Sequence, residues 1–163
     1  QGKKIRQKYL EEDAVNAVKY LNSLGFANRD IIVYGMSLGT YTALYAVTAM
    51  QKQEPFDALI LEVPFTSLLD TALYHVTFGG IVSVPLDLLV KDTYNNLSLV
   101  DKIRSRVLIM TTESDSLIPP AQAKALYRYA PEPKTLKIYQ GATHDTLFNL
   151  RNYRDILEWL QLS

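Results

Sequence analysis

The spacing of apolar and polar positions predicts helices and strands that alternate along the chain. Residues 8–24 carry apolar side chains at helical spacing (Leu10, Ala14, Ala17, Val18 and Leu21), which predicts an amphipathic helix that Gly25 can end. The same spacing predicts a helix after residue 39, another from Pro119-Pro120 through Leu126, and a closing helix over 146–161. Proline fits the first turn of the third helix, where its missing N–H costs nothing.

Four short segments between these helices are predicted to be strands, at 31–34, 58–61, 107–110 and 135–139. The run at 58–61 contains no polar residue, as is typical of a parallel strand covered on both faces. Strands that alternate with helices indicate parallel βα units, so the predicted class is α/β. The length of 163 residues suits a single domain over 1–163. Between residues 64 and 100 the pattern loosens, and no regular element is predicted there.

The composition excludes several classes of function. Seventeen Lys and Arg balance 17 Asp and Glu, so no basic surface favours nucleic acid. Cysteine is absent and the two histidines lie far apart, which argues against a metal site. No apolar run reaches the ~18 residues of a transmembrane segment, and the first residues do not resemble a signal peptide. We therefore expect a soluble protein, with a cytoplasmic location favoured but the compartment left open.

The stretch Gly35-Met36-Ser37-Leu38-Gly39 leads from a predicted strand into a predicted helix. A Gly-x-Ser-x-Gly motif in this context predicts a sharp, strained turn that exposes the serine hydroxyl above the sheet. We expect Gly35 and Gly39 to be glycine because a Cβ would collide where strand and helix approach. The Leu38 N–H would be an unpaired donor at the helix start, placed for an oxyanion. The alternative is a glycine-rich turn that contains a serine by chance.

A serine nucleophile needs a base and an orienting acid. His144 follows the strand at 135–139, so it should lie at the same sheet edge as Ser37, whereas His75 is interpreted as a surface or lid residue. Asp115 follows the strand at 107–110 and is the preferred acid. Glu113 is a nearby alternative, and Asp145 is discounted because it adjoins the histidine.

With these residues in place, the chain resembles the α/β-hydrolase superfamily, in particular its serine esterases, lysophospholipases and acyl-thioesterases. The resemblance is carried by YGMSLGTYTAL, VLIMTTESDSLIPP and GATHDTLF, and it is supported by the stretches at 13–15, 63–67 and 94–97. It implies a three-layer fold with a mostly parallel sheet, Ser37 as nucleophile, Asp115 as acid and His144 as base, without cofactor or metal. Thr112 replaces the glycine or histidine frequent near the acid.

The resemblance covers only the C-terminal two-thirds of such a hydrolase. Only 30 residues precede the strand at 31–34, and no His-Gly loop that could donate the second oxyanion N–H occurs upstream. The strand at 31–34 would then be a bare apolar sheet edge, which folded proteins avoid. Three explanations remain: the chain is a fragment whose missing segment pairs there, which we favour, or it self-associates along this edge, or it is a reduced and poorly active relative.

The function expected from these features is hydrolysis of esters or thioesters of apolar acyl groups through an acyl-enzyme. Residues 64–100 would form a lid or acyl pocket hinged at Gly79-Gly80, or they would simply pack as core. One alternative is a peptidase of the prolyl-oligopeptidase type, although Leu38-Gly39-Thr40 departs from its usual Tyr-Gly-Gly. Another is a non-catalytic binding domain derived from a hydrolase. The candidate pocket residues are Phe65, Leu68, Leu69, Leu73 and Phe78.

Overall fold

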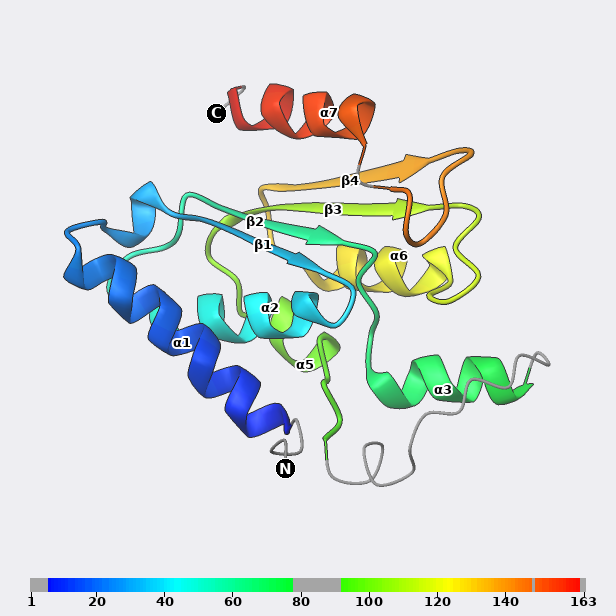
Figure 1. Ribbon diagram of the computed structural model, residues 1–163, viewed down its shortest axis with the longest axis horizontal. Helices are drawn as coiled ribbons and strands as arrows, with labels where there is room; N and C mark the ends of the chain where they lie inside the picture. Colours follow the sequence, from blue (N-terminus) through cyan, green and yellow to red (C-terminus); the bar gives the residue numbers. More distant parts are fainter. Residues whose placement is uncertain (1–5, 78–91, 148, 162–163) are drawn as a thin grey trace, which may run out of the picture.

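A parallel four-stranded sheet forms the centre of the computed structural model, which describes residues 6–77, 92–147 and 149–161. Its strands are β1 (Ile32–Met36), β2 (Ala58–Glu62), β3 (Arg106–Thr112) and β4 (Lys134–Tyr139), and they lie in that order (Figure 1). The bounds of each strand agree with those of one of the four predicted strand segments to within one or two residues at either end. The predicted α/β class and parallel sheet are confirmed.

Helices cover both faces of the sheet and complete three layers. On one face lie α1 (Gln7–Ser23), α2 (Gly39–Met50) and α6 (Pro120–Tyr129), while α7 (Leu150–Gln161) lies on the other (Figure 1). A short 3-10 helix, η1 (Asn28–Asp30), leads into β1. Because all four strands run the same way, the loops that follow them meet at one edge of the sheet.

The core divides along the two faces of the sheet. Leu59 and Leu61 of β2 pack toward α2 and α6, whereas Ile60 packs with Met110 and with Ile156 of α7. All five residues of β2 are buried. Removing a large aliphatic side chain of this kind from water stabilises a fold by about 1.5–3 kcal/mol. The inner strands therefore hold the sheet edge rigidly.

In the described part of the segment between 64 and 100 there are two helices that the sequence pattern did not predict. They are α3 (Leu68–Thr77) and α5 (Leu97–Val100). His75 lies on α3 and is buried, and its Nε2 is 2.7 Å from the carbonyl oxygen of Leu117, so the interpretation as a surface residue is wrong. Gly79-Gly80 and Phe78 lie outside the described residues.

The closing helix begins later than the predicted residue 146. Thr143 and Thr146 form a turn in which the Thr143 N–H donates to Thr146 Oγ1, and the Asn149 side-chain amide donates to the Thr146 carbonyl. These side-chain bonds compete with helical ones, so α7 starts at Leu150.

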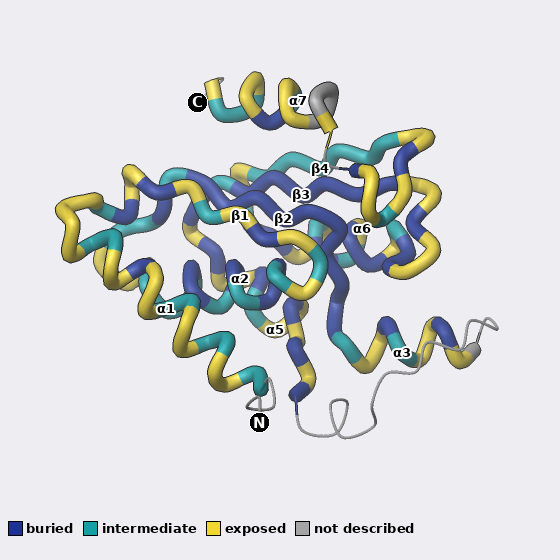
Figure 2. The backbone as a smooth tube through the Cα atoms, viewed as in Figure 1, coloured by how far each residue is buried: buried dark blue, intermediate teal, exposed yellow. Residues whose placement is uncertain are grey.

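The strand β1 lies at one end of the sheet, as the sequence predicted. Ile32, Tyr34 and Met36 alternate onto one face and remain 44%, 41% and 47% exposed (Figure 2). In Figure 1, α7 lies over β4 and not over β1. Among the described residues, the face of β1 opposite α1 and α2 is thus largely uncovered.

Candidate active site

Ser37 lies in the tight turn that joins β1 to α2. Its φ is +51°, a left-handed conformation that a non-glycine residue rarely adopts. Its N–H donates to the carbonyl of Glu62 at 2.9 Å, and its carbonyl accepts from both the N–H and the hydroxyl of Thr40. These bonds hold the strained backbone and raise the Ser37 hydroxyl above the sheet edge.

Only one of the two elbow glycines is required by close packing. A Cβ on Gly35 would collide with the backbone of Gly39 and approach Ala43 Cβ at 2.8 Å. A Cβ on Gly39 would meet no described atom within 4 Å. The predicted collision is confirmed at Gly35 and wrong at Gly39, because the Gly39 backbone itself fills the space above Gly35.

The structure brings Ser37, His144 and Asp115 into one hydrogen-bonded row. His144 Nε2 lies 3.2 Å from Ser37 Oγ, and His144 Nδ1 lies 2.9 Å from Asp115 Oδ2. A carboxylate can only accept, so Nδ1 carries the proton and Nε2 is free to accept from the serine hydroxyl. The arrangement has the order nucleophile, base and acid, and it joins three loops that are far apart in the sequence.

Asp115 is fixed by bonds that leave one oxygen for the histidine. Its Oδ1 accepts from the N–H groups of Leu117 and Ile118 at 2.8 and 2.7 Å, while Oδ2 faces His144. The Asp115 side chain is fully buried, whereas that of His144 is 13% exposed. The two alternative acids, Glu113 and Asp145, are both exposed.

Two further contacts hold the acid and histidine loops. The Thr112 hydroxyl donates to the carbonyl of Ala142 at 2.6 Å and so links the end of β3 to the loop that carries His144. His75 Nε2 donates to the Leu117 carbonyl and ties α3 to the acid loop. Sequence reasoning assigned neither residue to the site, and only the end-of-strand position of Thr112 could have indicated it.

The backbone of Leu38 offers a donor next to Ser37. Leu38 precedes the first residue of α2 and has helical dihedrals, and no described residue accepts a hydrogen bond from its N–H. A free first-turn N–H beside a nucleophile is suited to hold a developing oxyanion.

Glu62 is a buried carboxyl group close to this row. It ends β2 and is fully buried, and neither carboxyl oxygen has a hydrogen-bond partner among the described residues. Burial raises the pKa of Glu62 from 4.5 to about 7, and the charge of His144 opposes that rise. Sequence analysis did not identify this group, because Glu62 follows an apolar run as an ordinary polar residue would.

The candidate pocket residues do not gather into one apolar surface. Phe65 is buried in a cluster with Tyr41, and Leu68 packs against it. Leu69 and Leu73, one helical turn apart on α3, are 47% and 53% exposed. The described residues thus divide between core and surface, and Phe78 lies outside them.

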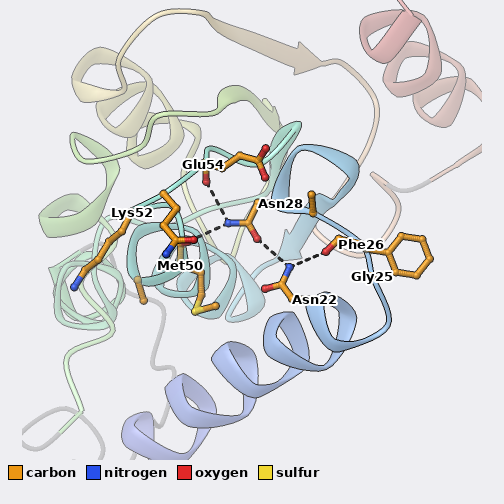
Figure 3. A pocket seen from close by; sticks show the side chains of 10 residues that line it. Asn22, Gly25, Phe26, Asn28, Met50, Lys52 and Glu54 are labelled. Carbon is orange, nitrogen blue, oxygen red and sulfur yellow. Dashed lines mark hydrogen bonds between the residues drawn. The ribbon is translucent and has the colours of Figure 1, made fainter.

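A hollow of about 580 Å³ lies at the other end of the sheet, around Asn28 (Figure 3). The Asn28 amide donates to the carbonyls of Met50 and Glu54 and accepts from the Asn22 side chain. All of these groups are paired, and they join the ends of α1 and α2 before β1 begins. These hydrogen bonds therefore support the fold, and the hollow lies far from Ser37.

The described part of the chain offers neither a metal site nor a membrane-spanning helix. No group of three or more His, Asp or Glu side chains there could hold a metal ion. No helix in the same residues is long and apolar enough to cross a membrane.

Comparison with known proteins identifies the family. The sequence model of the prolyl oligopeptidase family matches residues 2–162. The chain belongs to this family. The departure of Leu38-Gly39-Thr40 from Tyr-Gly-Gly, which weighed against it, does not exclude the chain. Membership also places the chain in the α/β-hydrolase superfamily, as its resemblance implied.

Individual relatives agree with this assignment. The lysophosphatidylserine lipase ABHD12 of Xenopus tropicalis is 29% identical over an alignment of 164 positions, gaps included, which covers 89% of this chain and 42% of that protein. Protein bem46 of Schizosaccharomyces pombe is 31% identical over 120 residues, 72% of this chain and 38% of that protein. The chain thus spans less than half the length of the curated relatives it matches.

A solved structure shares the fold. The acetyl xylan esterase of Paenibacillus sp. R4 superposes with a TM-score of 0.71 at 18% identity, over 94% of this chain and 52% of that one. The three-layer α/β-hydrolase fold predicted from the sequence is confirmed.

Proposed function

We propose that this chain is a serine hydrolase that cleaves carboxylic ester or thioester bonds through an acyl-enzyme on Ser37. The observation that supports it is the row of hydrogen bonds from Ser37 Oγ to His144 and from His144 to Asp115. Membership of a hydrolase family supports the reaction class. Neither a metal nor a cofactor is needed for this chemistry.

In the proposed reaction, the Ser37 proton passes to His144 Nε2 as Oγ bonds to the substrate carbonyl carbon. The carbonyl π electrons move to oxygen, and the Leu38 N–H donates to that oxyanion. Asp115 keeps Nδ1 protonated and stabilises the positive imidazolium. His144 then gives its proton to the leaving group, and the carbonyl re-forms as the acyl-enzyme. Water, activated by His144, releases the acid in the same way.

The preference for apolar acyl groups is supported by two exposed leucines next to site residues, with further exposed leucines on α3. Leu38 and Leu117 are 40% and 38% exposed beside Ser37 and Asp115, and Leu69 and Leu73 are exposed on α3. The bond from His75 to Leu117 places α3 next to the acid loop. Exposed leucines at this edge suit a hydrocarbon chain better than a charged substrate.

The direct test is labelling with a fluorophosphonate followed by measurement of the intact mass. We expect one adduct on the wild-type chain and none on Ser37→Ala or His144→Ala. Ser23→Ala, which removes an exposed serine at the end of α1, is the matched control and should be labelled normally. No adduct on a wild-type chain shown to be folded would contradict the proposal and favour a binding domain without activity.

A second pair of variants tests the acid. Asp115→Asn should lower the labelling rate by about 10³–10⁴-fold, because the amide favours the wrong histidine tautomer. Asp145→Asn, beside the histidine but exposed, should leave the rate unchanged. Equal loss in both variants would exclude Asp115 as the specific acid.

The family assignment also favours a peptidase as a second candidate. Matched nitrophenyl esters and nitroanilides of the same acyl groups, from two to ten carbons, separate the two activities. Faster turnover of longer esters with little anilide cleavage would support the esterase. Comparable cleavage of peptide anilides would support the peptidase.

A further inference from the structure

A buried acid that the proposed mechanism does not use lies at the reacting edge of the sheet. Glu62 is fully buried at the end of β2, and both of its carboxyl oxygens are without a partner among the described residues. Leaving such a group unpaired is costly, since its desolvation is not offset by hydrogen bonds. An unpaired, buried carboxyl group in a native structure therefore needs an explanation from the groups around it.

The register of the sheet shows which way Glu62 points. Side chains alternate along a strand, so Glu62 shares a face with Ile60, which packs against Met110 and Leu147. The same cluster contains Ala142, two residues before His144. Glu62 therefore lies beneath the loop that carries the histidine.

Nothing beside Glu62 in the sheet can satisfy its oxygens. Its register partners are Met36 on β1 and Met110 on β3, and thioethers donate no hydrogen bond. The charged group that acts on it comes from the loop above, namely His144 after β4. The histidine ring is the one charge in the described surroundings that Glu62 can sense.

The backbone around Glu62 is strained in a way that sets its position. Val63 has a φ of +43°, an outlier for a β-branched residue, and its side chain lies in the same cluster as that of Ile60. The Glu62 carbonyl meanwhile accepts from the Ser37 N–H. Strain of this kind persists where the surrounding structure requires it, and it clusters at functional sites. One residue thus holds the serine backbone and faces the histidine.

We propose that Glu62 is a positioning residue that acts through His144: its unpaired carboxylate stabilises the imidazolium that forms when Ser37 loses its proton. The catalytic part of this inference rests on the proposed function. The coupling of Glu62 to His144 is independent of that function. Asp115 orients the ring by a hydrogen bond, while Glu62 contributes a second negative charge without contact. No proton is transferred to or from Glu62 in the step.

The coupling is measured by ¹³C NMR titration of the Glu62 carboxyl carbon. In the wild-type chain we expect a midpoint near pH 7. In His144→Gln the midpoint should rise by about half a pH unit or more, because the positive charge that the ring carries when protonated is gone. An unchanged midpoint would overturn the proposal whether or not the chain reacts with any substrate.

The consequence is measured as the rate of fluorophosphonate labelling against pH. Above about pH 7, where Glu62 is ionised, the wild-type rate should be about tenfold higher than that of Glu62→Gln, and the two rates should converge at lower pH as Glu62 takes up its proton. Thr111→Val removes another buried and unpaired oxygen, from β3, and should keep the wild-type profile. A Glu62→Gln profile that matches wild type would overturn the inference. If the wild-type chain is not labelled at all, the proposed function fails, and the NMR titration alone decides the coupling.

Discussion

At the scale of the residue, Gly35 marks the closest approach of strand and helix in this fold. We expect Gly35→Ala to lower the free energy of unfolding by about 3 kcal/mol or more, because its Cβ would meet the rigid backbone of Gly39. Gly39→Ala should change it by no more than about 1 kcal/mol and in the stabilising direction, since alanine suits a helix and its Cβ has open space. Urea denaturation of the two variants measures both values. Equal destabilisation by the two substitutions would contradict the conclusion that only Gly35 is required by close packing.

The same residue scale explains what could be predicted of the site. Ser37, Asp115 and His144 could be chosen because each follows its own strand, and parallel strands deliver their following loops to one edge. Whether position 39 requires glycine could not be judged, because the motif does not show that the Gly39 backbone is what a Cβ on Gly35 would meet. Glu62 was missed because a charged residue after a strand is normally in water.

At the scale of the element, strand β2 carries a group that makes stability depend on pH. Burial raises the pKa of Glu62 from 4.5 to about 7, so between these values the folded chain holds a proton that the unfolded chain has lost. Its contribution to the free energy of unfolding therefore falls as pH rises through this window, by up to about 3 kcal/mol, and is constant above it.

Glu62→Gln should remove that dependence. The variant should match wild type near pH 4.5 and exceed it by up to about 3 kcal/mol at pH 8, because the amide never ionises. Urea denaturation at pH 5 and pH 8 gives the pH dependence of each chain. Subtracting the dependence of the variant from that of wild type cancels the titration of all other groups. An equal pH dependence in both chains would show that Glu62 is not the group responsible. Combined with slower labelling, greater stability would indicate a carboxyl group kept for function.

Elements differ in how far their own residues determine them. The strands at 58–61 and 107–110 could be recognised because burial on both faces leaves only apolar residues. The helix α3 could not, since its apolar residues divide between a partly buried side at Leu68 and an exposed side at Leu69 and Leu73. Its place is fixed instead by the tertiary bond from His75 to Leu117, which no local pattern shows.

At the scale of the whole molecule, the sheet ends in an apolar strand that described residues cover on only one of its faces. The side chains of Ile32 and Met36 are nearly half exposed, and a groove lined by Ala14, Ala17 and Ile32 runs between α1 and β1. Exposed apolar strand edges favour pairing with a further strand, whether from a longer polypeptide or from a second copy. Because the chain spans less than half the length of the relatives it matches, both kinds of partner strand are relevant.

We therefore expect this chain in isolation to associate as its concentration rises from about 1 to 100 µM. Ile32→Lys should shift it toward the monomer, because a charged side chain on an edge strand opposes pairing. Tyr20→Lys, which changes a more exposed aromatic residue on α1 away from the edge, should associate like wild type. Size-exclusion chromatography with light scattering gives the mass of each. A monomeric wild-type chain across this range would show that the edge is tolerated in water, and association of both variants to the same extent would locate the contact on another surface.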